Sequence, residues 1–186
     1  IIFNISFLNT TNITNMSSLF KYKNMNLTLV WNTSMARLNK AGPLMTPAHI
    51  AIEPTNACNA KCPVCETGKD EMLRTKGLLD RKKFELLIDK NFRSINTLMY
   101  YFMGEPFLNK NSYDMIKHAR SKSIYVETCT NGDLVDAKGV LYSDINKISF
   151  QIGGMTEKSH QIYRVNSSLN KVKKNLYELI EEKKKV

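Results

Sequence analysis

The amino-acid sequence predicts an α/β fold built on a parallel sheet. Four short apolar runs of strand character recur along the 186 residues, and each is followed by a stretch with helical spacing of its apolar side chains. Strands and helices that alternate in this way give parallel strands joined by right-handed crossovers. Four such units are too few to close an eight-unit barrel, which typically takes about 250 residues.

The predicted strands are short and largely apolar, as strands buried in a parallel sheet are. They run over His49 to Ile52, Thr97 to Phe102, Ile124 to Thr128 and Lys147 to Gln151. The helical patterns between them each place apolar residues on one face, which predicts packing against the sheet.

The anchors of the first two helices are Phe84, Leu87 and Ile88, then Tyr113, Ile116 and Ala119. The third helix has few anchors and is predicted to be short, with Val135, Val140 and Leu141. The last helix has the clearest apolar stripe, formed by Leu169, Val172, Leu176, Leu179 and Ile180.

Residues 1–34 differ in character from the rest of the chain. They are rich in Asn, Thr and Ser and show no sustained period, which predicts a poorly ordered or marginal extension. Residues 35–186 are the predicted core domain. Because the sequence begins without methionine and ends at Val186 inside a charged helical pattern, we expect the domain to be incomplete at its C-terminus, as the front part of a longer protein.

The net charge of +10 would suit an anionic partner. The lysines are spread along helical patterns, however, and the densest group, Lys183 to Lys185, follows two glutamates. A solvated helix face is the favoured interpretation, so nucleic acid is not the expected partner. No apolar stretch is long enough to span a membrane, and no membrane partner is expected.

Three cysteines carry the strongest functional signal. Cys58, Cys62 and Cys65 form a C-x₃-C-x₂-C triplet directly after the first predicted strand. Three thiolates on one loop can hold three irons of a 4Fe-4S cube, whereas an ordinary electron-transfer cluster of this type uses four cysteines. The fourth iron would then be open to another ligand.

A structural zinc loop is the alternative interpretation of the triplet. Zinc strongly prefers a closed set of four ligands, usually supplied as two pairs. The candidates for a fourth ligand are Cys129, His49 and His118, and none of them belongs to a second pair. A disulfide framework is less favoured still, because four cysteines in 186 residues are not a disulfide-dense composition.

A second candidate feature is the turn Gly104-Glu105-Pro106 at the end of the second predicted strand. Glycine lets backbone approach a ligand closely, a carboxylate accepts hydrogen bonds from an ammonium group, and proline stiffens the turn. An ordinary turn with a solvated Glu105 is the alternative. The position favours function, because barrel active sites are assembled where the strands end.

With these segments in this order, the sequence resembles the radical S-adenosylmethionine (radical SAM) superfamily from about Pro47 onward. The matching segments are the cysteine triplet, residues 100–109, 126–132 and 148–154, and Tyr163-Arg164-Val165. The resemblance is greatest to the branch that carries a cysteine-rich SPASM extension. It implies a partial (βα)₆ TIM-like barrel that stops after about four βα units.

The resemblance also implies two cofactors, a 4Fe-4S cluster on the triplet and S-adenosylmethionine. Residues implied to bind S-adenosylmethionine are Gly104, Glu105, Pro106, Ser149, Gln151, Arg164 and Val64. Ser149 and Gln151 would face the ribose, and Val64 would contact the adenine where the family often has an aromatic residue. Arg164 would meet the carboxylate of the cofactor, or would instead be a surface helix charge.

The activity implied is reductive cleavage of S-adenosylmethionine to a 5′-deoxyadenosyl radical, which abstracts hydrogen from a substrate such as a peptide or protein side chain. The expected partner is a low-potential donor such as flavodoxin or ferredoxin, in a reducing cytoplasm. Two alternatives stay open: an RNA-modifying radical SAM enzyme and a non-catalytic, zinc-stabilised interaction module. No cysteine follows Cys129, so ligands for SPASM clusters would lie beyond Val186.

Overall fold

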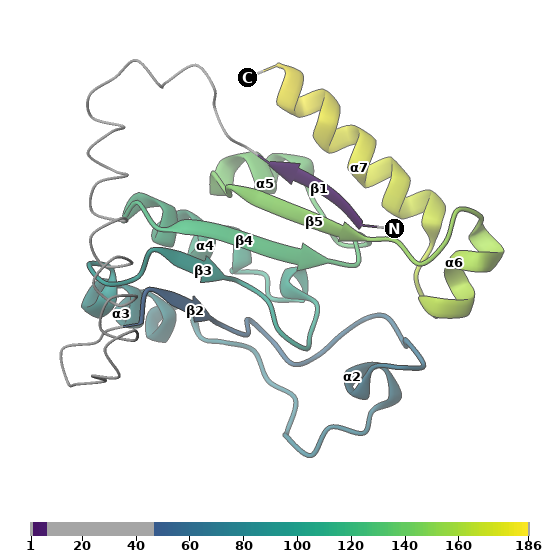
Figure 1. Ribbon diagram of the computed structural model, residues 1–186, viewed down its shortest axis with the longest axis horizontal. Coiled ribbons are helices and arrows are strands. Elements are labelled where there is room, and N and C mark those ends of the chain that lie inside the picture. Colours follow the sequence, from purple (N-terminus) through teal and green to yellow (C-terminus); the bar gives the residue numbers. More distant parts are fainter. Residues whose placement is uncertain (1, 7–46, 186) are drawn as a thin grey trace, which may run out of the picture.

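The structure is a computed structural model that describes residues 2–6 and 47–185, and its centre is a five-stranded sheet (Figure 1). The strand order is β1-β5-β4-β3-β2. The strands are β1 (Ile2–Ser6), β2 (His49–Ala51), β3 (Thr97–Met99), β4 (Tyr125–Thr130) and β5 (Lys147–Gln151).

The strands β2 to β5 are parallel and lie side by side in chain order, which confirms the predicted α/β fold. The second predicted strand, Thr97 to Phe102, corresponds to β3 and is shorter than predicted. It ends at Met99, after which Tyr100 still bonds to β4: its N–H donates to the carbonyl of Glu127 at 2.8 Å, and its carbonyl accepts from the Thr128 hydroxyl at 2.7 Å. The chain then leaves the sheet toward the Gly104 turn.

Helices follow each parallel strand, and Figure 1 shows α3, α4 and α5 along one side of the sheet. Their residues are α3 (Arg81–Asn91), α4 (Ser112–Ser121), α5 (Ala137–Ser143), α6 (Glu157–Tyr163) and α7 (Leu169–Lys184). Two shorter pieces, α2 (Glu66–Lys69) and the 3₁₀ turn η2 (Pro106–Leu108), lie in the loops beyond β2 and β3.

The hydrophobic core lies between the sheet and this helical layer. Leu98 of β3, Val126 of β4 and Ile148 of β5 are fully buried, and Phe84 of α3 meets Tyr100 edge-on at 5.9 Å between ring centroids. The prediction that Leu87 is an anchor of this helix is wrong, because this residue is 45% exposed. Phe84 and Ile88, one helical turn apart, occupy the core instead.

The opposite face of the sheet is more polar, because alternate residues of a strand point to opposite sides. In β4, Glu127 and Cys129 are half-buried on this face, while Val126, Thr128 and Thr130 are buried on the other. Glu127 forms an ion pair with Lys147 of β5, with 3.2 Å between Oε2 and Nζ. This face therefore offers polar groups where a barrel would have its interior.

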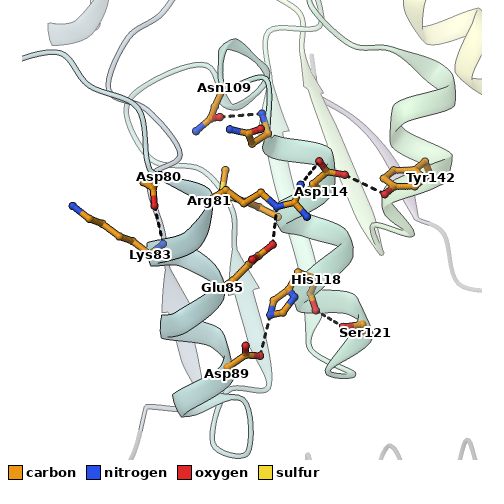
Figure 2. A network of polar contacts seen from close by, with 12 residues as sticks. Asp80, Arg81, Lys83, Glu85, Asp89, Asn109, Asp114, His118, Ser121 and Tyr142 are labelled. Atoms are coloured by element: carbon orange, nitrogen blue, oxygen red, sulfur yellow. Dashed lines mark hydrogen bonds and ion pairs between the residues drawn. The ribbon is translucent and has the colours of Figure 1, made fainter.

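A network of ion pairs joins the helices on their outer side (Figure 2). Arg81 at the start of α3 contacts Glu85 at 2.7 Å and Asp114 of α4 at 2.6 Å. Asp114 also accepts a hydrogen bond from the Tyr142 hydroxyl of α5 at 3.1 Å. Three consecutive βα units are thus tied together through one carboxylate.

The strand β1 pairs antiparallel with β5, from Ile2 opposite Gln151 to Ser6 opposite Lys147. This strand was not expected in a segment predicted to be a poorly ordered or marginal extension, because five residues are too few to show a period. The rest of the Asn-rich segment, residues 7–34, lies outside the described residues, so the division of the chain at residue 34 stays a prediction. Within the described part of the chain, no helix combines the length and apolar character needed to cross a membrane.

Candidate functional site

A cavity of about 190 Å³ opens where β3, β4 and β5 end. Seven residues predicted from the sequence lie around it: Cys58, Cys62, Cys65, Gly104, Glu105, Gln151 and Arg164. They come from the cysteine loop, the turn after β3, the end of β5 and the end of α6, so the fold brings four distant segments together.

Three other predicted residues lie elsewhere. Val64, in the loop that carries the three cysteines, is 70% exposed, whereas Ser149 is buried within β5. Pro106 is buried at the first position of η2, where its fixed φ suits the start of a helical turn. None of the three lines the cavity.

The cysteine loop is closed at its base by its own polar contacts. The hydroxyl of Thr55 donates to the carbonyl of Gly77 at 2.7 Å, and the side chain of Asn56 donates to the carbonyl of Thr75 at 2.9 Å. The same amide accepts from the Gly77 N–H at 2.8 Å. Residues 54–79 therefore form one loop, the cysteine loop, whose two ends are bonded to each other.

The turn after β3 packs directly on this base. Asn109, which is buried, donates to the carbonyls of Pro54 at 3.0 Å and Leu79 at 2.9 Å. The Glu105 N–H donates to the carbonyl of Ala57 at 2.9 Å. A Cβ on Gly104 would lie 2.0 Å from the carbonyl oxygen of Thr55. Glycine at this position therefore lets the backbone of the cysteine loop pack against the turn.

A second glycine contact was missed by sequence reasoning. A Cβ on Gly68, in α2, would lie 2.5 Å from both the nitrogen and the oxygen of Cys62. The short helix thus packs backbone to backbone against the central cysteine. The available signal was a glycine inside a helix only three residues after Cys65.

The three loop cysteines are free thiols, and two of their sulfurs accept hydrogen bonds. Asn131 Nδ2 donates to the Cys58 sulfur at 3.8 Å, and Arg164 Nη1 donates to the Cys62 sulfur at 3.5 Å. Burial is the main reason why the pKa of the Cys58 thiol is raised. Loss of the thiol proton at neutral pH would therefore depend on a bound metal.

Three cysteine thiols around one cavity suit a cluster, which is held by thiolates. In residues 2–6 and 47–185, no group of three or more His, Cys, Asp or Glu side chains converges on one metal position. Zinc requires its ligands at about 2.0–2.3 Å from one point. In a cube each cysteine binds a different iron, so the three sulfurs can stand apart around one cavity.

Glu105 is a buried carboxyl group, 2% exposed, and not a solvated charge. One carboxyl oxygen accepts from the Thr130 hydroxyl at 2.7 Å and the Phe107 N–H at 3.3 Å, and the other accepts from the Asn131 N–H at 2.8 Å. Burial outweighs these bonds and raises its pKa to about 7. Of about four acceptor positions on a carboxylate, one is left for a ligand donor.

Arg164 follows α6 and faces the cysteine loop. Its contact with Cys62 is not that of a surface helix charge. Its Nε is buried and, in this structure, has no hydrogen-bond partner. Buried polar groups are rarely left unpaired, so this nitrogen is an exception in the part of the chain that the structure describes.

Three further polar side chains line the cavity. Gln151 Nε2 donates to the Cys129 sulfur at 3.8 Å, and Tyr101 lies beside them on the cavity wall. Burial raises the pKa of the Tyr101 hydroxyl to about 12 and also raises the pKa of Cys129. Cys129, a candidate fourth zinc ligand in the sequence analysis, is half-buried and lines the cavity as a free cysteine.

Comparison with known proteins gives one family and a consistent fold. The profile of the Radical SAM superfamily matches residues 52–186. Among solved structures, native anSMEcpe with bound AdoMet is similar at 20% identity over 74% of this chain, with a TM-score of 0.60. Streptococcus suis SuiB bound to S-adenosylmethionine is similar at 18% identity over 77% of this chain, with a TM-score of 0.58.

The chain spans 42% of the length of the first of these proteins and 34% of the second. At these identities the likeness concerns the fold alone. No curated protein matches the sequence.

Proposed function

The chain belongs to the radical SAM superfamily, whose cofactors are a 4Fe-4S cluster and S-adenosylmethionine, and we propose that this chain forms the cofactor-binding part of a radical enzyme. The observation that carries the proposal is the convergence of Cys58, Cys62, Cys65 and Glu105 on one cavity at the carboxyl edge of the parallel sheet. Barrel enzymes assemble their active sites at this edge.

Cys58, Cys62 and Cys65 would hold the cluster, and the open iron would receive the amino and carboxylate groups of S-adenosylmethionine. A cluster held there would supply the chemistry of the family, one-electron reductive cleavage of S-adenosylmethionine to a 5′-deoxyadenosyl radical that would abstract hydrogen from a substrate. The protein holds these groups in place and keeps water out.

Glu105 would receive the ammonium group of the cofactor. Its buried carboxylate is fixed by Thr130 and Asn131, and an ammonium group beside it would favour the charged form. The Gly104 turn places this carboxylate against the cysteine loop, because the Glu105 N–H is bonded to Ala57. Pro106 stiffens the same turn.

The remaining assignments concern the other groups of S-adenosylmethionine. Arg164 would meet its carboxylate, a role supported by its place among the residues that line the cavity. Gln151 would face the ribose, with Ser149 behind it in β5, and Val64 would offer an apolar contact to the adenine.

The substrate, partners and branch follow from the resemblance. The favoured substrate is a peptide or protein side chain, as in much of the SPASM-containing branch, and the electron donor would be flavodoxin or ferredoxin in the cytoplasm. Residues 35–186 would be the radical SAM core domain, with residues 1–34 as an extension. An RNA-modifying radical enzyme is the second candidate, and specific binding of RNA by the chain would support it.

The test is anaerobic reconstitution of the full chain with iron and sulfide, followed by low-temperature electron paramagnetic resonance of the reduced protein. We expect a signal from a reduced 4Fe-4S cluster that shifts when S-adenosylmethionine is added. Cys62→Ala should lose the cluster, whereas Cys129→Ala, the matched control in the same cavity, should keep it.

Two results would contradict the proposal. Tight binding of one zinc ion with no cluster would favour the interaction module, because that module needs a single metal position. A full four-iron cluster in Cys62→Ala would remove this cysteine from the ligand set.

A further inference from the structure

The contact between Arg164 and Cys62 gives the cluster site a fixed positive charge beside one of its sulfurs. Arg164 Nη1 donates to the Cys62 sulfur at 3.5 Å, and Cys62 is only 5% exposed. A guanidinium group stays protonated in proteins. Arg164 therefore places a cation next to this sulfur.

The backbone on either side holds this contact in place. The Arg164 N–H donates to the carbonyl of His160 at 2.7 Å, and the Lys61 N–H donates to the carbonyl of Val165 at 2.7 Å. Residues 61–62 of the cysteine loop are thus joined to residues 164–165 by one backbone bond and one side-chain bond. Arg164 approaches Cys62 from a fixed position.

The side chain of Arg164 is also confined along its stem. A Cβ on Gly153 would lie 3.0 Å from the Arg164 Cγ, so the stem lies against the bare backbone of the loop after β5. His160, fully buried, fixes that loop, because its Nδ1 accepts from the Gly153 N–H at 3.2 Å. Its Nε2 lies 2.9 Å from the Ser167 hydroxyl.

The charge has a direct consequence for electron transfer. A reduced cluster carries one more negative charge than an oxidised one, and hydrogen bonds to its sulfurs and nearby charges set its reduction potential. A cation in a water-poor site stabilises the more negative state. Asn131, which bonds to Cys58, supplies a neutral donor and lacks this effect of charge.

We infer that Arg164 is a positioning residue that holds Cys62 and raises the reduction potential of the cluster, an inference that rests on the proposed cluster site. This role differs from binding the carboxylate of S-adenosylmethionine, because it acts before that cofactor arrives. The reaction concerned is a one-electron reduction in which an external low-potential donor is oxidised and no proton is transferred.

The experiment is a redox titration of the reconstituted full chain without S-adenosylmethionine, followed by the resonance signal of the reduced cluster. In Arg164→Met, the ratio of reduced to oxidised cluster at a fixed potential should fall about tenfold, a shift of about 59 mV to more negative values for one electron. Arg164→Lys, which keeps the charge, should shift less. Arg93→Met, which removes an exposed cation before β3, should match the wild type.

The outcomes separate this inference from the proposed function. A wild-type protein without any cluster would overturn the proposed function. A clustered Arg164→Met protein with the wild-type potential would overturn the role of Arg164 alone. If Arg164→Met loads no cluster, Arg164→Gln decides, because it keeps a donor and loses the charge: a negative shift supports the inference, and an unchanged potential contradicts it.

Discussion

At the scale of single residues, Glu105 shows how a binding group can weaken the protein that carries it. Its carboxyl group is buried with three protein donors, yet its pKa is raised from the ordinary value of 4.5 to about 7 because burial dominates. Near neutral pH the ionised form is therefore disfavoured in the folded protein until a positive ligand group arrives. The same desolvation that costs stability strengthens the attraction to an ammonium group.

The sign of the pH dependence follows. Because the folded pKa of Glu105 lies above the unfolded one, its contribution to stability is fully present below pH 4.5 and is lost as the pH rises through 7. A shift of this size corresponds to about 3 kcal/mol. In the cofactor-free protein, Glu105→Gln should lose this part of the pH dependence, as measured by urea unfolding at pH 5 and pH 8. An identical pH slope in both proteins would show that Glu105 does not titrate in this range.

At the scale of elements, the turn after β3 and the cysteine loop pack as one unit. Their close approach requires a glycine at position 104. Gly104→Ala should lower the free energy of unfolding by about 3 kcal/mol, the upper part of the usual range for overpacking, because the added Cβ would meet the Thr55 carbonyl. Chemical denaturation measures the loss, and iron content after reconstitution should fall with it.

Gly77→Ala is the matched control for that substitution. It lies in the cysteine loop, against which Gly104 packs, and a Cβ there would meet no atom within 4 Å. Its stability and iron content should stay close to those of the wild type. Wild-type stability and iron content in Gly104→Ala as well would mean that the close packing at Gly104 is not required.

The elements themselves were largely predictable, because strands and helices leave local patterns. The strand Lys147–Gln151 matches its prediction, and the short α5 was expected from its few anchors. The edge strand β1 and the four-residue α2 were not expected, because neither is long enough to show a period.

The candidate site was predictable in part for the same reason. The cysteine triplet lies within one short stretch of sequence, and so does the Gly104-Glu105 pair. Their chemistry could therefore be predicted from the sequence. The bond from Asn131 to Cys58 joins residues 73 positions apart, and the bond from Arg164 to Cys62 joins residues 102 positions apart. Which side chains meet over such separations is decided by the packing of the whole sheet.

At the scale of the whole molecule, β1 is set apart because it is the one antiparallel strand among those described and lies at the edge of the sheet. Deletion of residues 1–6 should speed hydrogen exchange at the β5 amides that face it, because their pairing would be lost. Amides of β4, which lies between β3 and β5, should keep their protection and serve as the internal control. Unchanged exchange in β5 would show that the pairing is not formed in solution.

The two bonds between residues 61–62 and 164–165 also bear on the order of events during synthesis. A chain leaves the ribosome from its N-terminus, so the three thiols emerge about a hundred residues before Arg164 and Val165 can join them. The base of the cysteine loop needs no residue beyond Asn109 and can close early. We therefore expect the nascent chain to display a closed loop with unanchored thiols, and iron to enter its final position only after translation has passed the fourth βα unit.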